Sequence, residues 1–139
     1  MIEKDLKTYL QASAAISDVV GTRIYSSRVA QGIKGALIVL RNITSQREYT
    51  LTGEVGVKLS TVQIDAYDQT SVKAQALAEK IRNRLSGYAG AAGDITIQAA
   101  TIIAERALRD TPVDASDQWT FRYSMDFDIW HTQSVPTFT

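Results

Sequence analysis

The chain of 139 residues has no cysteine, a single histidine and only two prolines. The absence of cysteine excludes disulfides, thiolate-bound zinc and cysteine nucleophiles, and it fits a reducing compartment. With one histidine, a metal site built from several imidazoles is impossible, and a serine triad would depend on His131 alone. We interpret His131 as an ordinary residue at a strand end, because no G-x-S-x-G motif is present to position a serine.

Net charge and long apolar runs are also missing. The formal net charge is +0, which argues against tight non-specific binding to duplex nucleic acid, because such binding depends on neutralising phosphates. No apolar run approaches the roughly 18 residues of a membrane span, and the N-terminus lacks the pattern of a signal peptide. Hydrophobic residues make up 45% of the chain, which predicts one folded domain over residues 1–139.

The clearest pattern in the sequence is the alternation from Trp119 to His131. Apolar side chains occupy one parity from Trp119 to Ile129, and polar side chains occupy the other. Because successive side chains of a strand point to opposite faces, this pattern predicts a strand with one apolar and one polar face. Its length, about 13 residues or roughly 40 Å, exceeds that of most strands, so we expect one end to overhang the sheet.

The main predicted helix spans Ser71–Ser86, where apolar residues recur at helical spacing and form one stripe. Residues 2–20 predict one or two short helices that end at Gly21. The remaining predicted strands are Ala36–Ile43, Val57–Asp68, Ile95–Ala104 and a short edge strand at Arg23–Tyr25. The apolar parity slips within two of them, which indicates a bulge near Ser60 or a change of covered side, and a second slip or doubly covered segment in Ile95–Ala104.

The connections are predicted as loops. Thr44–Gly56 has no Asn-Gly type of turn, so we expect a long hairpin loop there. Gly87–Gly93 is expected to be a flexible connection, Arg106–Gln118 a charged loop, and residues 133–139 a loose tail. The fold class is therefore α+β: a four-stranded, mostly antiparallel sheet with one long helix and a short N-terminal helical segment on one face.

Possible sites of chemistry are weak. Four aspartates could gather on neighbouring strands and bind Mg²⁺ or Ca²⁺, but a solvated strand face explains them more simply; they are Asp65, Asp68, Asp126 and Asp128. The glycines at 87, 90 and 93 follow a helix, whereas anions bind at helix N-termini. Trp130 breaks the apolar parity, so it either covers a secondary cluster under the first helix or anchors an interface.

Several segments, taken in their order and spacing, resemble the tail completion proteins of long-tailed bacteriophages and prophages. The resemblance covers roughly residues 1–132, and it is carried by Val20–Tyr25, Arg47–Gly53, Val62–Tyr67, the helix Ala74–Leu85, Glu105–Arg106 and Ser124–His131. It implies a structural role like that of tail terminators, with no enzymatic activity and no cofactor. Such proteins assemble as a ring, expected to be a hexamer, that stops growth of the tail tube and offers a surface to the head connector.

The resemblance also implies the partners: further copies of the chain, the tail tube protein and a head connector or neck protein, with DNA only in transit through the ring. It places the protein in the virion, and in the host cytoplasm during assembly, without a membrane. We hypothesise that the two long loops make the contacts, through Arg47, Glu48 and Tyr49 in one and Arg109 and Asp110 in the other, together with Trp130.

Three other functions remain open on the sequence alone. A neck adaptor on the head side is the nearest alternative. A divalent-metal-dependent enzyme would use the acidic residues around Asp65 and Asp126, and calorimetric titration with Mg²⁺ or Mn²⁺ would reveal it. A nucleic-acid binder would use the basic face of the helix and would lose affinity steeply with salt.

Overall fold

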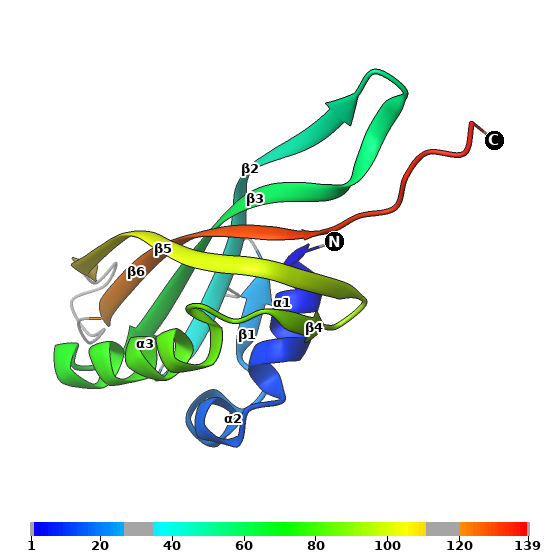
Figure 1. The fold of residues 1–139 in the computed structure, drawn as a ribbon. Coiled ribbons are helices and arrows are strands. Elements are labelled where there is room, and N and C mark those ends of the chain that lie inside the picture. Colours follow the sequence, from blue (N-terminus) through cyan, green and yellow to red (C-terminus); the bar gives the residue numbers. More distant parts are fainter. Residues whose placement is uncertain (1, 27–34, 111–119, 139) are drawn as a thin grey trace.

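The computed structural model describes residues 2–26, 35–110 and 120–138 (Figure 1). Within these residues the helices are α1 (Ile2–Gln11), α2 (Ala14–Val20) and α3 (Ser71–Leu85). The strands are β1 (Ile24–Ser26), β2 (Leu37–Thr50), β3 (Gly53–Asp68), β4 (Gly90–Ala92), β5 (Ile95–Asp110) and β6 (Thr120–Thr132). The predicted α+β class is confirmed, as are the helices in residues 2–20, the helix that begins at Ser71 and the edge strand near Tyr25.

The sheet has six strands in the order β1-β2-β3-β6-β5-β4. The four long strands pair antiparallel, and β1 pairs parallel to β2. The prediction of a four-stranded sheet was wrong by two short edge strands of three residues each: β1 lies where an edge strand was predicted at Arg23–Tyr25, whereas β4 was not predicted. β4 lies within the glycine-rich segment that was predicted to be a flexible connection. Three residues of Gly and Ala carry no alternation, so the pairing of β4 with β5 could only be seen in the fold.

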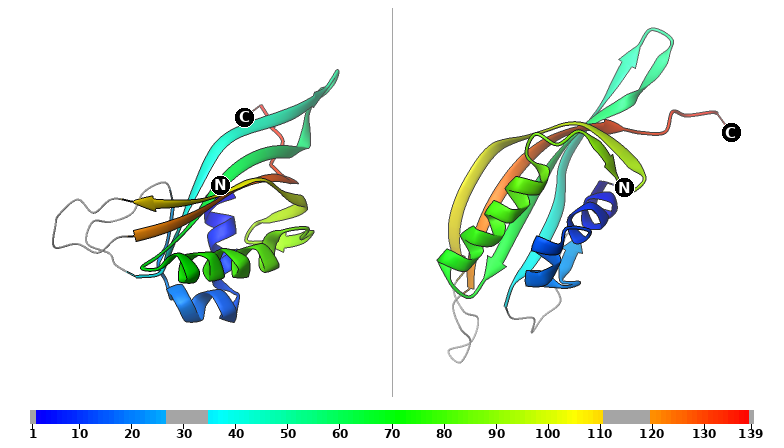
Figure 2. Two further views of the ribbon diagram at one scale, coloured as in Figure 1. Left: turned by 90° about the vertical axis from the view of Figure 1, so that its left-hand side faces the viewer. Right: turned by 60° about the horizontal axis from the view of Figure 1, so that its bottom comes forward.

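All three helices lie on one face of the curved sheet (Figure 2). They pack on it through the apolar side chains that the helical and strand periods predict, including Leu6, Ile16, Leu77, Ile81, Ile64 and Phe127. Thr70 begins α3, since its side chain accepts a hydrogen bond from the Lys73 amide at 3.2 Å. The other face of the sheet is called the outer face below.

The two parity slips have different origins. In β5 the register shifts between Ile97 and Ala99 and again between Ile102 and Ala104, so bulges bring Ala100 and Ile102 to the helix face. In β3 the predicted bulge near Ser60 was wrong, because β3 keeps an unbroken register with β6 from Val57 to Asp68. Ser60 is simply a polar residue in a buried position of the helix face. The shift lies across the ladder in β2, between Asn42 and Thr44.

The overhang occurs at a different place from the one predicted. β6 lies in the middle of the sheet, where it pairs with β3 and β5. The β2–β3 hairpin projects instead, because β3 pairs with β2 down to Gly53 but with β6 only from Val57. We call residues 47–56 the arm. The figure shows it extending away from the helices (Figure 1).

In both segments that were predicted to be long loops, the first residues belong to a strand. β2 and β3 are joined by only Leu51 and Thr52, so the predicted loop at Thr44–Gly56 was wrong. Gly53 has φ +134°, a backbone conformation that L side chains rarely adopt, and its glycine makes this tight turn possible without Asn-Gly. The predicted loop at Arg106–Gln118 was also wrong at its start, because β5 continues to Asp110 opposite β6. Residues 111–119 lie outside the described residues.

Candidate assembly interface

The arm carries two strongly exposed apolar side chains. Tyr49 is 67% exposed, and Leu51 in the turn is fully exposed. Arg47 forms an ion pair with Glu54 across the arm, at 3.7 Å, and a hydrogen bond to the side chain of Gln133. A hairpin that shows apolar side chains to water and contributes nothing to the core is typical of a binding element.

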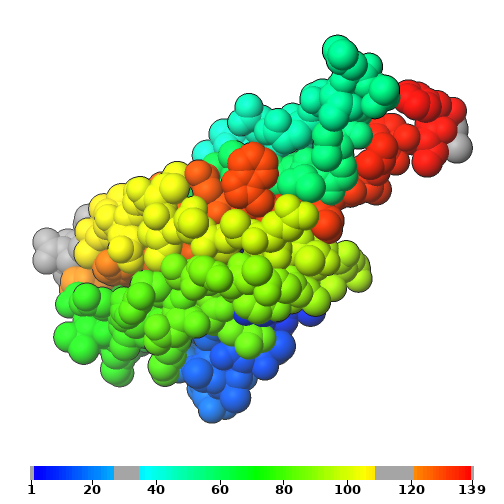
Figure 3. All heavy atoms as spheres, in the orientation of Figure 1, coloured from blue at the N-terminus to red at the C-terminus, as the bar shows by residue number. Residues whose placement is uncertain are grey.

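The segment after β6 runs beside the arm (Figure 3). The Gln133 amide donates to the Gly56 carbonyl at 3.0 Å, and its side-chain amide donates to the Val55 carbonyl at 2.9 Å. Between the arm and this segment lies an open groove of about 800 Å³. Its lining residues are Arg47, Tyr49, Thr52, Gly53, Glu54, Ser134, Val135, Pro136 and Phe138. The groove is therefore formed by the tip of the β2–β3 hairpin and by the segment that follows β6.

A buried polar pair marks the place where the arm joins the body. His131 Nδ1 lies 2.9 Å from the Thr132 carbonyl oxygen, which can only accept, so Nδ1 carries the proton. In the neutral ring, Nε2 then accepts from the Ser60 hydroxyl at 2.8 Å. Burial lowers the pKa of His131, more than the neighbouring Thr132 carbonyl raises it. This arrangement satisfies both nitrogens and supports the interpretation of His131 as a structural residue.

The predicted interface residues fall at two separate ends of the molecule. Arg47, Glu48 and Tyr49 lie on the arm, with Glu48 at a shift in the β2 register. Arg109 and Asp110 are the last residues of β5, where their backbones pair with Phe121 and Thr120. The proposed roles of these two side chains lie outside the described residues. The structure therefore brings the first three together and keeps the other two apart from them.

Trp130 lies near the base of the arm, on the outer face. It pairs with Leu59 of β3 and Ala99 of β5, and it has the opposite parity to the buried Ile129 and His131. The alternative that placed it under the first helix was wrong, because α1 packs on the opposite face. Trp130 and Leu59 instead give the outer face a partly buried apolar spot beside the arm.

Sequence reasoning missed three apolar residues of this surface: Leu51, Val135 and Phe138. All three are exposed, and Phe138 almost completely so. One signal was available, since an apolar residue between Thr50 and Thr52 is unusual in a tight turn. The segment of Val135 and Phe138 was interpreted as a loose tail, and nothing in its composition indicates that it follows the arm.

The aspartates are held by separate partners. Asp65 is buried between Arg41 and Arg122, at 3.8 and 3.7 Å, and it accepts from Gln63. Asp126 pairs with Arg106 at 3.3 Å, and Asp128 accepts from Thr61 at 2.7 Å. In the part of the chain that the structure describes, no group of three or more acidic, histidine or cysteine side chains could hold a metal ion.

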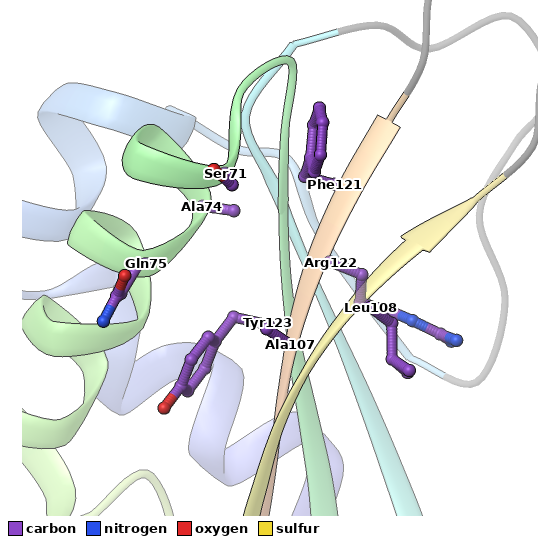
Figure 4. Close-up of a pocket in the computed structure, with 8 residues that line it drawn as sticks. All are labelled: Ser71, Ala74, Gln75, Ala107, Leu108, Phe121, Arg122 and Tyr123. Carbon is purple, nitrogen blue, oxygen red and sulfur yellow. The ribbon is translucent and has the colours of Figure 1, made fainter.

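A second hollow, of about 330 Å³, opens between the start of α3 and the ends of β5 and β6 (Figure 4). Its lining residues are Ser71, Ala74, Gln75, Ala107, Leu108, Phe121, Arg122 and Tyr123. The figure shows Tyr123 on the side of the helix and Arg122 and Leu108 turned away from it. These lining residues include no carboxylate and no imidazole, so they form no acid–base pair.

None of the described helices combines the length and the apolarity needed to cross a membrane. Exposed apolar side chains on a projecting hairpin are typical of an interaction site. Comparison with known proteins agrees: the family described as "Tail completion protein gp17" matches residues 4–132. The chain therefore belongs to this phage tail completion family.

The fold is also found in a solved particle. A chain in the structure described as "Virion of native gene transfer agent (GTA) particle" superposes with a TM-score of 0.74 at 16% sequence identity, and the match covers 94% of each chain. At this identity the likeness establishes the fold. No curated protein sequence matches the chain.

Proposed function

We propose that copies of this chain close into a ring, a hexamer, on the last ring of a phage or prophage tail tube. The ring stops polymerisation of the tube and forms the surface to which the head connector binds, while DNA passes through its lumen. The observation that carries this proposal is the family match over residues 4–132. The shared fold with a chain of a gene transfer agent virion supports it, since that chain is also part of a virion.

The surfaces support an assembly role for the protein in the virion, after assembly in the host cytoplasm. The arm with Arg47, Glu48 and Tyr49 offers one contact surface, and the end of β5 with Arg109 and Asp110 offers another at a distance from it. A ring requires two different patches, because each copy meets its neighbours head to tail. Trp130, beside the arm, extends the first patch, and the tube protein and the connector bind the faces of the ring that remain.

The test is a phage or prophage in which this gene is disrupted. If the protein is a terminator, electron micrographs of the lysate show headless tails with tubes of uncontrolled length, and the wild-type gene supplied in trans restores both length and head joining. Headless tails of normal length would contradict the terminator role and favour a neck adaptor. Normal infectious particles in the absence of the gene would contradict both.

A further inference from the structure

Within the described residues, two strand edges of this sheet have long stretches without a partner strand, one on each side. β1 covers β2 only at Ile38–Leu40, and β4 covers β5 only at Ile95–Ile97. Just beyond these paired stretches, one backbone group of each strand also has a partner. The Asn42 amide of β2 donates to Glu3 at 3.2 Å, and the Ala100 carbonyl of β5 accepts from Gly87 at 2.8 Å. Beyond these, no other strand of the described chain pairs with the outward sides of β2 and β5.

The bare stretches are Ile43–Thr50, which we call the β2 edge, and Thr101–Leu108, which we call the β5 edge. Each is about eight residues long, or roughly 26 Å. Every residue of the β2 edge is exposed, and in the β5 edge only Ile102 is partly buried. Such an edge presents unpaired backbone N–H and C=O groups and is a template for another strand.

Both edges lack two of the residue types that usually protect a strand edge against pairing. Natural proteins place lysine or proline on exposed edges, and neither stretch contains either residue. Both edges instead carry residues that favour strands, with Ile43 and Tyr49 exposed on one and Ile103 exposed by 55% on the other. Each also carries one acidic and one basic residue, Arg47 with Glu48 and Glu105 with Arg106, so that bringing the edges together adds no net repulsion.

The two edges lie at opposite ends of the molecule, one along the arm and one along the far half of β5 (Figures 1 and 2). One chain therefore cannot pair them with each other. We propose that the β2 edge of one copy pairs with the β5 edge of the next copy, so that the sheets join by main-chain hydrogen bonds. This inference rests on the proposed ring, and it names the strands that hold the ring together.

The bulges make this pairing selective. The extra residue Ile43 at the start of the β2 edge and the extra residue Ile103 within the β5 edge each form a bulge in a bare edge. A bulge bends a strand and leaves one residue unpaired, so a regular foreign strand does not fit against either edge. Pairing is then favoured with a partner whose own irregularity matches, which a second copy provides. A closed ring of such contacts leaves no bare long edge.

The absence of cysteine from the chain gives a direct test. We would introduce cysteine at Gln46 on the β2 edge, and combine it in turn with cysteine at Thr101, Ala104, Arg106 or Leu108, the positions of the β5 edge that share the outer face with Gln46. Under oxidation of the assembled full-length protein, at least one pair is expected to give covalent trimers and larger species. Each single variant can give dimers at most, because one cysteine can form only one disulfide.

A matched control combines cysteine at Gln46 with cysteine at Glu79, which is exposed on α3 and away from both edges. This control is expected to give no species beyond the dimer. As a second measurement, amide hydrogen exchange in residues 43–50 and 101–108 should slow by about tenfold or more on assembly, with little change at exposed positions of α3.

The outcomes separate the two proposals. An assembled protein in which no cysteine pair gives species beyond the dimer, and in which the edge amides gain no protection, overturns the edge pairing and leaves the ring standing. A protein that stays monomeric, both alone and with its tail tubes, overturns the proposed ring and the pairing with it.

Discussion

Asp65 is the residue with the clearest electrostatic role, since its side chain is only 1% exposed and lies between Arg41 and Arg122. Replacing Asp65 by alanine removes the carboxylate that Arg41 and Arg122 share on the outer face of the sheet. We expect Asp65→Ala to lower the free energy of unfolding by about 2–4 kcal/mol, as removal of one member of a buried ion pair does. Urea denaturation measures this.

The matched control is Asp126→Ala, which removes a carboxylate of similar geometry from a more exposed pair with Arg106. Water screens such a pair, so a loss of at most about 1 kcal/mol is expected. Equal losses for the two variants would show that the burial of Asp65 has no energetic consequence.

His131 gives the stability a defined pH dependence. Burial holds its folded pKa below the ordinary value of 6.5, so the unfolded chain binds more protons in this range. The stability that the neutral His131 ring contributes is fully present above pH 6.5 and is lost as the pH falls through the folded pKa. Over this range the free energy of unfolding changes by at most about 1.4 kcal/mol per pH unit. Urea denaturation at several pH values between about 5 and 7 measures it.

Because His131 is the single histidine of the chain, His131→Asn should remove most of this slope. A variant that keeps the full slope would mean that another group is responsible. His131 is thus a structural residue whose neutral ring accepts the hydrogen bond from Ser60 at the base of the arm.

At the scale of elements, the sequence predicts what periodicity can reveal. α3 and β6 each bury one face in one core, so a helical stripe and a strict alternation appear in the residues. The arm has water on both sides, and residues 44–50 consequently show no alternation, which led to the loop prediction. β1 and β4 are too short to show any period, and their pairing is set by the rest of the sheet.

The candidate interface was predictable only in part, for the same reason. Arg47, Glu48 and Tyr49 were selected because a long charged connection suggests contacts, and the structure places them on a projecting strand. The neighbouring groove depends on Val135 and Phe138 lying beside the arm. That proximity arises from the hydrogen bonds of Gln133 to β3, which no local pattern encodes.

The arm can be removed without cutting into the core. Arg47 and Lys58 are paired, so joining them through Asn-Gly in place of residues 48–57 gives a shorter hairpin with a favourable turn. We expect the free energy of unfolding to change by only about 1 kcal/mol, since the deleted residues are exposed or half-buried, while the ring fails to form.

Urea denaturation and solution mass measurements in the presence of tail tubes check the two expectations. As a control, replacing only Thr52 by asparagine, before Gly53, retains Leu51, the length of the arm and its bare edge. An armless protein that still assembles and caps tubes would exclude the arm from the contacts.

At the scale of the whole molecule, two strongly exposed apolar residues on different elements lead to different predictions. Leu51 ends the arm, whereas Val72 lies on α3 and is 77% exposed. We expect Leu51→Asp and Val72→Asp both to fold with nearly unchanged stability, because neither side chain is buried. Only Leu51→Asp should weaken assembly, as measured by native mass spectrometry with tail tubes. Equal effects would mean that the arm has no special place in the contacts.

The arm has a final consequence for the free protein. A two-stranded hairpin with water on both faces is at best marginally stable, so it opens locally far more often than the body of the sheet. Chymotrypsin cleaves after aromatic residues and leucine, so in the described chain its early cuts should fall after the exposed Phe138 and, within the arm, after Tyr49 and Leu51, while Leu6 and Phe127 stay protected in the core. Incorporation into a virion would shield the bonds of the arm, so that nicking there distinguishes spare copies from those already built into a tail.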